Sequence, residues 1–231
     1  MQQLPLGVRL PDRAVFASFL TGRNTQARAY AGQIAEGSVS GTTWLCGPHG
    51  AGKTHLLQAI CAQAGSSRAV GYVPLRELAR LGVEVLDGLR QLECLCLDDL
   101  DEVVGRPDWE RALFGVFREI EESGSRLVVA AQAPPALLEW ALPDLGSRLS
   151  ACAVFQLRVL DEAEQQAALQ LRARLRGFEL PDETSRWLQR RYSRDMHRLY
   201  ELLDTLDEAA LVAQRRLTVP FIREVLARKR L

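Results

Sequence analysis

The feature that most constrains this sequence is the glycine-rich stretch Gly47-Pro-His-Gly-Ala-Gly-Lys53-Thr54, which fits the pattern G-x-x-x-x-G-K-[ST] at every position. Glycines let the backbone turn sharply so that its N–H groups converge on phosphate oxygens, and a following helix directs its positive N-terminus at the same group. An apolar run at residues 43–46 precedes the stretch, and an apolar helical face follows it. The context therefore predicts a phosphate-binding loop between a strand and a helix.

Two side chains in this loop carry the predicted chemistry. Lys53 is expected to reach the β- and γ-phosphates of a nucleotide, and the Thr54 hydroxyl to ligate Mg²⁺. Lys53 is one of only two lysines among the 29 basic residues of the chain. The rest of the predicted nucleotide-binding set lines the loop and the first helical turn, namely Gly47, His49, Gly50, Ala51, Gly52 and His55.

A second motif, Leu95-Cys-Leu97-Asp98-Asp99, is an apolar strand that ends in two carboxylates. This arrangement is typical of the acidic segment that accompanies a phosphate loop, known as Walker B. Asp98 is expected to hold Mg²⁺, directly or through water. Asp99 is the candidate catalytic base or water-orienting group. Asp101 and Glu102, which follow, are interpreted as solvated loop acids.

The periodicity of apolar residues predicts two parts. Short apolar runs alternate with helical stretches through the first part, which indicates a parallel sheet with crossover helices. The runs occupy residues 43–46, 69–73, 94–97, 127–131 and 154–157. A helix at 25–36, capped by Asn24, is expected to come first. The other helices of this part are expected at 53–64, 75–90, 108–123 and 134–147.

The second part reads as helices only, at residues 161–176, 182–192, 195–213 and 219–229. The predicted fold class is therefore α/β, with a five-stranded parallel sheet followed by a small all-helical lid subdomain. We assign residues 1–11 to an extended N-terminal segment, 12–158 to the α/β nucleotide-binding core and 159–231 to the lid.

Composition narrows the class of protein without naming a function. The 231 residues are 47% hydrophobic and 25% charged, which excludes a disordered or fibrous chain. The formal net charge of zero argues against a protein that coats nucleic acid. No apolar run is long enough to span a membrane. The five cysteines lie mostly in apolar runs, which favours buried thiols over metal ligands and indicates a reducing cytoplasm.

The phosphate loop, the Asp98-Asp99 pair and the helical C-terminal part together resemble an AAA+ module. In more detail the chain is similar to the ATPase domain of the replication initiator DnaA, whose N-terminal box resembles Phe16-Ala-Ser-Phe19 and Gly22-Arg-Asn24. The segments Gly71-Tyr-Val-Pro74 and 168–181 resemble a family of shorter DnaA homologues that act as regulatory inactivators of DnaA. The resemblance covers essentially the whole chain.

The resemblance implies roles for two arginines. Asp144-Leu-Gly-Ser-Arg148-Leu149 resembles box VII of the family, whose arginine reaches the nucleotide of a neighbouring subunit. The resemblance therefore implies that Arg148 would be an arginine finger that acts in trans. Ser193-Arg194-Asp195-Met196 resembles sensor 2, so Arg194 would contact the phosphates of the protein's own nucleotide.

The resemblance also assigns the N-terminal segment. Gln3-Leu4-Pro5-Leu6 resembles the family's motif for binding the sliding clamp, the β subunit of DNA polymerase III. The two leucines would fill an apolar pocket on the clamp, Gln3 would make polar contacts at its rim, and Pro5 would restrict the peptide in advance. DNA would then be reached only indirectly, through the clamp.

The implied function is negative regulation of chromosomal replication initiation. With ADP or ATP and Mg²⁺ in its own site, and with the DNA-loaded clamp, the protein would stimulate hydrolysis of ATP bound to DnaA.

Gln132 follows the strand at 127–131, where related ATPases place a polar sensor, and Ala130 and Ala131 offer no polar side chain. The chain's own ATPase activity is therefore expected to be weak or absent. The alternative is an AAA+ ATPase that itself acts as an initiator-like or helicase-loading protein. A homo-oligomer is left open.

Overall fold

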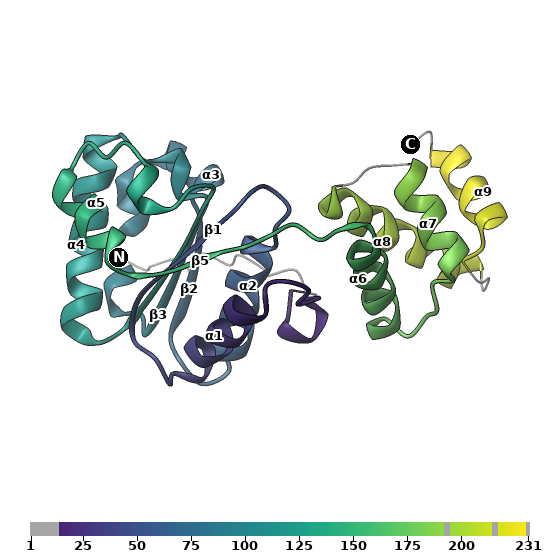
Figure 1. Cartoon of the computed structure of the whole chain (residues 1–231), viewed down its shortest axis with the longest axis horizontal. Helices are drawn as coiled ribbons and strands as arrows, with labels where there is room; N and C mark the ends of the chain where they lie inside the picture. Colours follow the sequence, from purple (N-terminus) through teal and green to yellow (C-terminus); the bar gives the residue numbers. More distant parts are fainter. Residues whose placement is uncertain (1–13, 192–194, 214–216, 230–231) are drawn as a thin grey trace, which may run out of the picture. The chain divides into compact units, whose positions relative to one another are not determined.

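The structure is a computed structural model that describes residues 14–191, 195–213 and 217–229. Its contacts divide the chain into two compact units, and the boundary along the sequence falls between Val159 and Leu160. Figure 1 shows a first unit with a central sheet and a second unit built of helices. Within the described ranges, no helix is both long and apolar enough to cross a membrane.

The first unit contains a five-stranded parallel sheet, as the sequence predicts. Its strands are β1 (Gly41–Cys46), β2 (Val70–Pro74), β3 (Cys94–Asp98), β4 (Arg126–Ala131) and β5 (Ala153–Gln156), in the spatial order β2-β3-β4-β1-β5. Strand β3 is buried along its whole length and β4 along all but its first residue, so both read as continuous apolar runs in the sequence.

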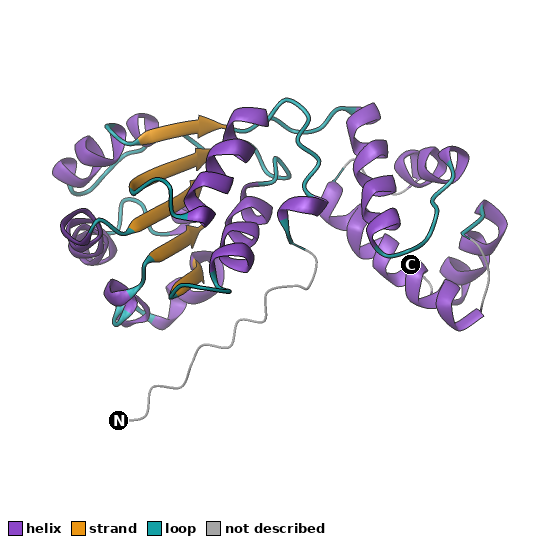
Figure 2. Cartoon of the chain, turned by 90° about the horizontal axis from the view of Figure 1, so that it is seen from below, coloured by secondary structure: helices purple, strands orange, loops and turns teal. Residues whose placement is uncertain are grey.

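Helices cover both faces of the sheet (Figures 1 and 2). On one face, α1 (Thr25–Glu36) and α2 (Lys53–Ala64) bury an apolar cluster that includes Leu57 and Ile60. On the other, α4 (Pro107–Ser123) and α5 (Pro143–Ser150) pack with Trp44, Trp109 and Leu97. The loop between β1 and α2 lies where β1 ends, so the sheet places it at the carboxyl edge of the strands.

The single helix predicted at residues 75–90 is wrong. A short helix, α3 (Leu75–Leu78), is followed by three 3₁₀ turns at Ala79–Leu81, Val83–Leu86 and Leu89–Gln91. The backbone has φ +98° at Gly82 and +77° at Gly88, so the right-handed helix cannot continue through either position. The apolar periodicity of this stretch instead belongs to successive turns that pack against α4.

The helix predicted at residues 134–147 is also displaced. A 3₁₀ turn at Pro135–Leu137 comes first, and α5 begins only at Pro143 and runs to Ser150. Proline restricts the preceding residue to extended backbone, and Leu142 accordingly has ψ 93°. Pro143 therefore starts a helix at its first position rather than continuing one.

The second unit consists of four helices in its described ranges: α6 (Glu162–Leu175), α7 (Asp182–Arg191), α8 (Met196–Ala213) and α9 (Val219–Lys229). Asp161 and Glu164 close the start of α6 with reciprocal side-chain-to-backbone hydrogen bonds of 2.9 Å each. Arg176, the residue that follows α6, forms ion pairs with Asp204 and Asp207 of α8, and these join the two helices at a partly buried position. The all-helical lid is as predicted.

Candidate functional site

The phosphate loop has the backbone that its glycines were expected to allow. Gly47, Gly50 and Gly52 have φ values of +146°, +77° and +94°, a region that side-chain-bearing residues rarely adopt. A Cβ atom at Gly47 would lie 2.5 Å from the carbonyl oxygen of Leu157, and one at Gly52 would lie 2.8 Å from the Phe19 ring. The loop is thus held close to its neighbours at two glycines.

Lys53 begins α2 and is only 8% exposed. Its Nζ donates hydrogen bonds to the carbonyl oxygens of Gly47 at 2.6 Å and Pro48 at 3.1 Å. Burial lowers the pKa of Lys53 from its usual value, and the negative charge of Asp98 opposes that shift. An ammonium group held inside the loop in this way is placed to exchange neutral carbonyl partners for charged phosphate oxygens.

Asp98 ends β3 and is 2% exposed. Its Oδ2 accepts a hydrogen bond of 2.8 Å from the Tyr72 hydroxyl, and its Oδ1 accepts one of 3.0 Å from the backbone N–H of Asp99. Burial, and then the charge of Asp98, raise the pKa of Tyr72, so this phenol remains a proton donor. The carboxylate is therefore fixed in orientation by two donors.

Asp99 is the only non-glycine residue with positive φ in the described ranges, at +55°. Nη2 of Arg76 contacts its Oδ1 at 3.2 Å. Burial and the neighbouring Asp98 raise the pKa of Asp99, and the Arg76 guanidinium lowers it. The candidate base is thus held in an uncommon backbone conformation and paired with a cation.

Asp101 and Glu102 make contacts that the sequence did not predict, although Glu102 is exposed as the sequence indicated. Both carboxylate oxygens of Asp101 accept hydrogen bonds from the backbone N–H of Gln132, at 3.0 and 2.9 Å. Oε1 of Glu102 accepts a hydrogen bond of 3.2 Å from Nε of Arg76. The sequence did not reveal these contacts because both partners come from other strand ends of the sheet.

Gln132 joins this acidic segment to the phosphate loop through its main chain. Its carbonyl oxygen accepts a hydrogen bond of 3.1 Å from the N–H of Gly47, while Asp101 holds its N–H. The Gln132 side chain is exposed. The backbone of Gln132, the residue that follows β4, therefore connects the acidic segment with the phosphate loop.

The first described residues contact the start of α2. Nε2 of His55 lies 3.2 Å from Oγ of Ser18 and 3.0 Å from the carbonyl oxygen of Val15, and its ring meets the edge of Phe19 at 5.4 Å. The sequence placed His55 in the predicted nucleotide-binding set. Its side chain joins the N-terminal box to the first turn of α2.

Asn24 precedes α1 but does not cap it with its side chain. Its amide nitrogen donates to the carbonyl oxygen of Arg158 at 2.9 Å, and its Oδ1 accepts from the N–H of Arg158 at 2.8 Å. This pair of hydrogen bonds fixes the N-terminal box to the segment that follows β5.

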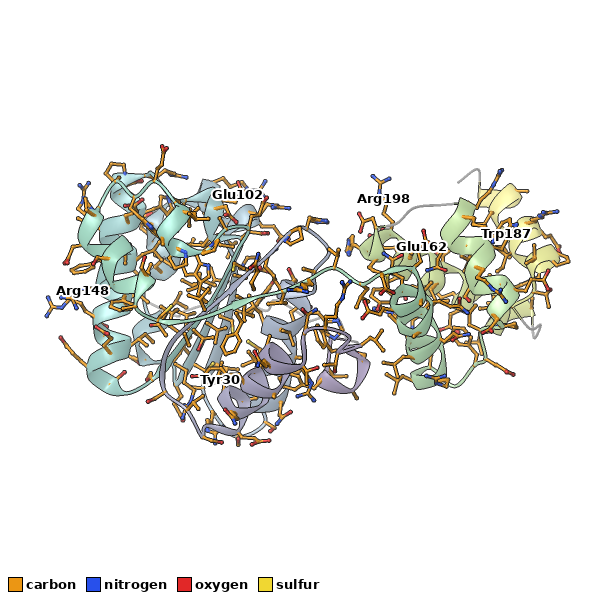
Figure 3. All side chains as sticks on the ribbon, in the orientation of Figure 1. Tyr30, Glu102, Arg148, Glu162, Trp187 and Arg198 are labelled. Atoms are coloured by element: carbon orange, nitrogen blue, oxygen red, sulfur yellow. The ribbon has the colours of Figure 1, made fainter. Side chains whose placement is uncertain are left out.

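Arg148 lies on α5, on the sheet face opposite to α2, and Figure 3 shows its side chain directed away from the core. Its guanidinium forms ion pairs of 3.6 Å with Asp144 and with Glu121 of α4, and lies 5.6 Å from the centre of the Phe114 ring. The structure does not bring Arg148 together with the phosphate loop of its own chain.

Two groups of predicted site residues lie outside the described residues. They are Arg194 of the predicted sensor 2, and the predicted clamp-binding residues Gln3, Leu4, Pro5 and Leu6. Both predictions stand as the sequence made them.

Sequence reasoning assigned no role to Tyr72 or Arg76, which contact the two carboxylates. The available signal was position. Strands β2 and β3 are parallel and adjacent, with Pro74 opposite Asp98, so residues near the end of β2 must lie beside the acidic pair. A tyrosine and an arginine on either side of Pro74 were therefore candidates.

The residues present suit a nucleotide with Mg²⁺. The loop N–H groups, the N-terminus of α2 and the buried Lys53 form a set of donors for phosphate. Thr54 is exposed in the first turn of α2, and the oriented carboxylate of Asp98 supplies oxygen ligands of the kind Mg²⁺ prefers. No group of three histidine, cysteine or acidic side chains suited to a metal occurs in the described part of the chain.

A parallel sheet in this strand order, a phosphate loop, a paired acidic segment and a helical lid define an AAA+ nucleotide-binding protein. Comparison with families of known proteins makes this more specific. The family model for the bacterial DnaA ATPase domain matches residues 10–156, and that for the Hda lid domain matches residues 161–226. The chain therefore belongs to the bacterial DnaA ATPase domain family and carries a lid of the Hda type, the combination of a DnaA-related replication regulator.

Solved structures support the same fold. Domain III of the replication initiation protein DnaA from Thermotoga maritima is similar with a TM-score of 0.78 and 22% identity, over 95% of this chain and 98% of that one. AMPPCP-bound DnaA from Aquifex aeolicus is similar with a TM-score of 0.71 and 20% identity, over 85% and 65% of the two chains. A replication initiator DnaA bound to AMPPCP and single-stranded DNA is similar with a TM-score of 0.70 and 20% identity, over 89% of this chain and 69% of that one.

Proposed function

We propose that this protein is a negative regulator of chromosomal replication initiation that stimulates hydrolysis of ATP bound to DnaA. The observation that carries the proposal is the position of Arg148, which is exposed on α5 and directed away from the core of its own chain. The DnaA-type core and the Hda-type lid support DnaA as the partner. AAA+ modules of one family can place a finger from one molecule at the nucleotide of the next.

The chemistry asked of Arg148 is electrostatic. A guanidinium inserted beside the transferring phosphoryl group offsets the charge that develops on its oxygens. In the unbound protein Asp144 and Glu121 hold this group at 3.6 Å, with all three side chains about half exposed. Exposed ion pairs of this kind are worth about 0–1 kcal/mol, so docking on a partner releases the arginine at little cost.

A nucleotide in the protein's own site sets the conformation that docks. We infer ADP or ATP as this nucleotide, with ADP favoured by the resemblance to regulatory inactivators of DnaA. Lys53 and the loop N–H groups would hold its phosphates, and Arg194 would contact them from the lid. Mg²⁺, held by Thr54 and Asp98, would neutralise phosphate charge.

The sliding clamp supplies the connection to DNA in this proposal. Residues Gln3, Leu4, Pro5 and Leu6 would bind the clamp and raise the local concentration of the regulator where replication is under way.

All five cysteines of the chain are free, which supports a reducing compartment such as the cytoplasm.

The test is single-turnover conversion of ATP bound to DnaA, with clamp and DNA present. Arg148→Ala is expected to lower the stimulated rate by roughly 10³-fold or more, the range found for other arginine fingers. Arg118→Ala is the matched control, because Arg118 is an exposed arginine of the neighbouring helix α4 in an ion pair with Glu122. If Arg148→Ala stimulates conversion as well as the unmodified protein, the role assigned to Arg148 is wrong.

A second measurement isolates the clamp. The double substitution Leu4→Ala and Leu6→Ala is expected to abolish clamp binding while nucleotide binding stays unchanged. Stimulation should then recover when the regulator is added at high concentration, because only the local concentration is lost. Clamp affinity that is unchanged by this substitution would contradict the assignment of residues 3–6.

The alternative function, an ATPase that itself acts as an initiator-like or helicase-loading protein, draws support from the intact set of Lys53, Thr54, Asp98 and Asp99. Steady-state ATP turnover by the purified protein alone separates the two. A rate on the order of 1 per second or more favours the alternative, and a far lower rate favours the regulator.

A further inference from the structure

Glu110, on α4, is a carboxylate with none of its surface exposed. Its Oε1 accepts hydrogen bonds from the backbone N–H groups of Gly105 at 2.6 Å and Ala141 at 3.2 Å. Its Oε2 accepts a third, of 2.6 Å, from the N–H of Leu142. Burial of a carboxylate is costly unless such donors satisfy it, so this side chain is retained with three backbone partners.

Two of these partners come immediately before α5, the helix that carries Arg148. The carbonyl oxygen of Leu142 accepts the first hydrogen bonds of that helix, from the N–H groups of Leu145 at 3.1 Å and Gly146 at 3.3 Å. Glu110 therefore holds, through its N–H, the residue on which the first turn of α5 is built. The short helix has no side-chain cap of its own at this end.

Trp140 also contacts this helix. Its indole Nε1 donates a hydrogen bond of 2.8 Å to the carbonyl oxygen of Pro135, and its ring lies against Gly146 so closely that a Cβ there would overlap it. Trp44 in turn packs edge-on against Trp140 and donates a hydrogen bond of 3.0 Å to the carbonyl oxygen of Ala133. The segment between β4 and α5 is thus fixed at several points.

We propose that Glu110 is a positioning residue for Arg148, an inference that rests on the function proposed above. Arg148 lies within two turns of Leu142, so the anchored end of α5 sets where its guanidinium is presented. A displacement of about 1 Å from productive geometry can cost up to roughly 10²-fold in rate. Glu110 acts through α5 and is not expected to touch the partner or its nucleotide.

The experiment compares Glu110→Gln with Glu122→Gln, a matched change on the exposed face of the same helix. The glutamine amide has one acceptor oxygen, so it leaves at least one of the three N–H groups without a partner. Hydrogen exchange should become faster across residues 141–149 in Glu110→Gln and stay unchanged in the phosphate loop. The stimulated single-turnover rate should fall by about 10- to 10²-fold, including at saturating regulator, while the protein's own nucleotide affinity stays within twofold.

A double variant tests whether Glu110 acts through Arg148. In an Arg148→Ala background, Glu110→Gln should cause no further loss of stimulation, because the group it positions is gone. A loss that persists in that background overturns the inference. The inference is also overturned if Glu110→Gln stimulates at the wild-type rate although hydrogen exchange across α5 has become faster.

The arginine variant separates this inference from the proposed function. If Arg148→Ala is impaired and Glu110→Gln is not, only the positioning role fails. If Arg148→Ala stimulates fully, the finger and its positioning fail together. Should Glu110→Gln not fold, Trp140→Phe serves instead, since it removes the hydrogen bond to Pro135 and keeps an aromatic ring near Gly146. A several-fold loss of stimulation that vanishes in the Arg148→Ala background is then expected, and unchanged stimulation overturns the inference.

Discussion

The Tyr72 hydroxyl donates a 2.8 Å hydrogen bond to Oδ2 of Asp98, and so joins the end of β2 to the carboxylate proposed to hold Mg²⁺. The other oxygen of Asp98 is occupied by the N–H of Asp99. Hydrogen bonds to a ligating carboxylate fix its orientation and affect metal affinity. The phenol thus links the strand beside β3 to the predicted metal site.

Tyr72→Phe is expected to lower the affinity for Mg²⁺, so that nucleotide binding requires a higher Mg²⁺ concentration. Loss of an outer hydrogen bond to a metal ligand typically costs about 10- to 100-fold in metal affinity, and we expect the lower end because the Asp99 N–H remains. Nucleotide affinity measured over a Mg²⁺ titration checks this. Tyr30→Phe is the control, since Tyr30 on α1 packs against Phe155 instead of the acidic pair. An unchanged Mg²⁺ midpoint in Tyr72→Phe would contradict the prediction.

Arg76→Ala is expected to raise the chain's own ATP turnover several-fold. Arg76 contacts Asp99 at 3.2 Å and lowers its pKa, so it both occupies the candidate base and makes it a weaker one. Its removal frees Asp99 and raises the pKa of that carboxyl. Steady-state turnover by the purified protein is the measurement. Arg118→Ala, which also removes an exposed cation, should have no effect, and Asp99→Ala should cancel the gain. Lower turnover in Arg76→Ala would mean that the arginine orients a working base.

The sequence predicted those parts of the site that depend on local pattern. The phosphate loop is defined by contiguous residues between β1 and α2, and Asp98 ends an uninterrupted apolar strand. The contacts made by Tyr72 and Asp101 could not be read in this way, because each crosses to a different strand end of the sheet.

The misplaced helices have the same kind of cause. Apolar spacing in residues 75–90 satisfies a helical pattern, yet Gly82 and Gly88 adopt positive φ and the apolar residues serve separate turns. Helical spacing reports which residues are buried, and it does not report whether the backbone between them is continuous. Pro143 gave a local signal for the start of α5 that the apolar pattern outweighed.

Cys152 should be unreactive toward thiol reagents at pH 8. Burial raises the pKa of this thiol to about 11, so about one molecule in a thousand carries the thiolate at that pH. The other four cysteines are buried. Because the folded pKa lies above the usual value of 9.0, the stability tied to the neutral thiol is present below pH 9 and is lost as pH rises toward 11.

Alkylation of the native protein should therefore be slow at pH 8, should accelerate steeply above pH 10, and should be fast at either pH in urea. Cys152→Ser identifies the thiol responsible for any native reaction. One rapidly modified thiol at pH 8 that disappears in this variant would contradict the burial of Cys152.

Gly146→Ala should destabilise the protein although alanine favours helix over glycine. Gly146 lies in α5, and a Cβ there would overlap the Trp140 indole, which is itself fixed by its hydrogen bond to Pro135. Overpacking of this kind costs about 1–3 kcal/mol of unfolding free energy, more than the roughly 1 kcal/mol gained from helix propensity. Gly32→Ala in α1 is the matched control, because a Cβ there meets only the end of the flexible Arg28 side chain, at 3.3 Å. Urea unfolding of both variants checks the prediction, with Gly32→Ala expected to be neutral or stabilising. If both variants gain stability alike, Trp140 moves aside freely and does not hold α5 in place.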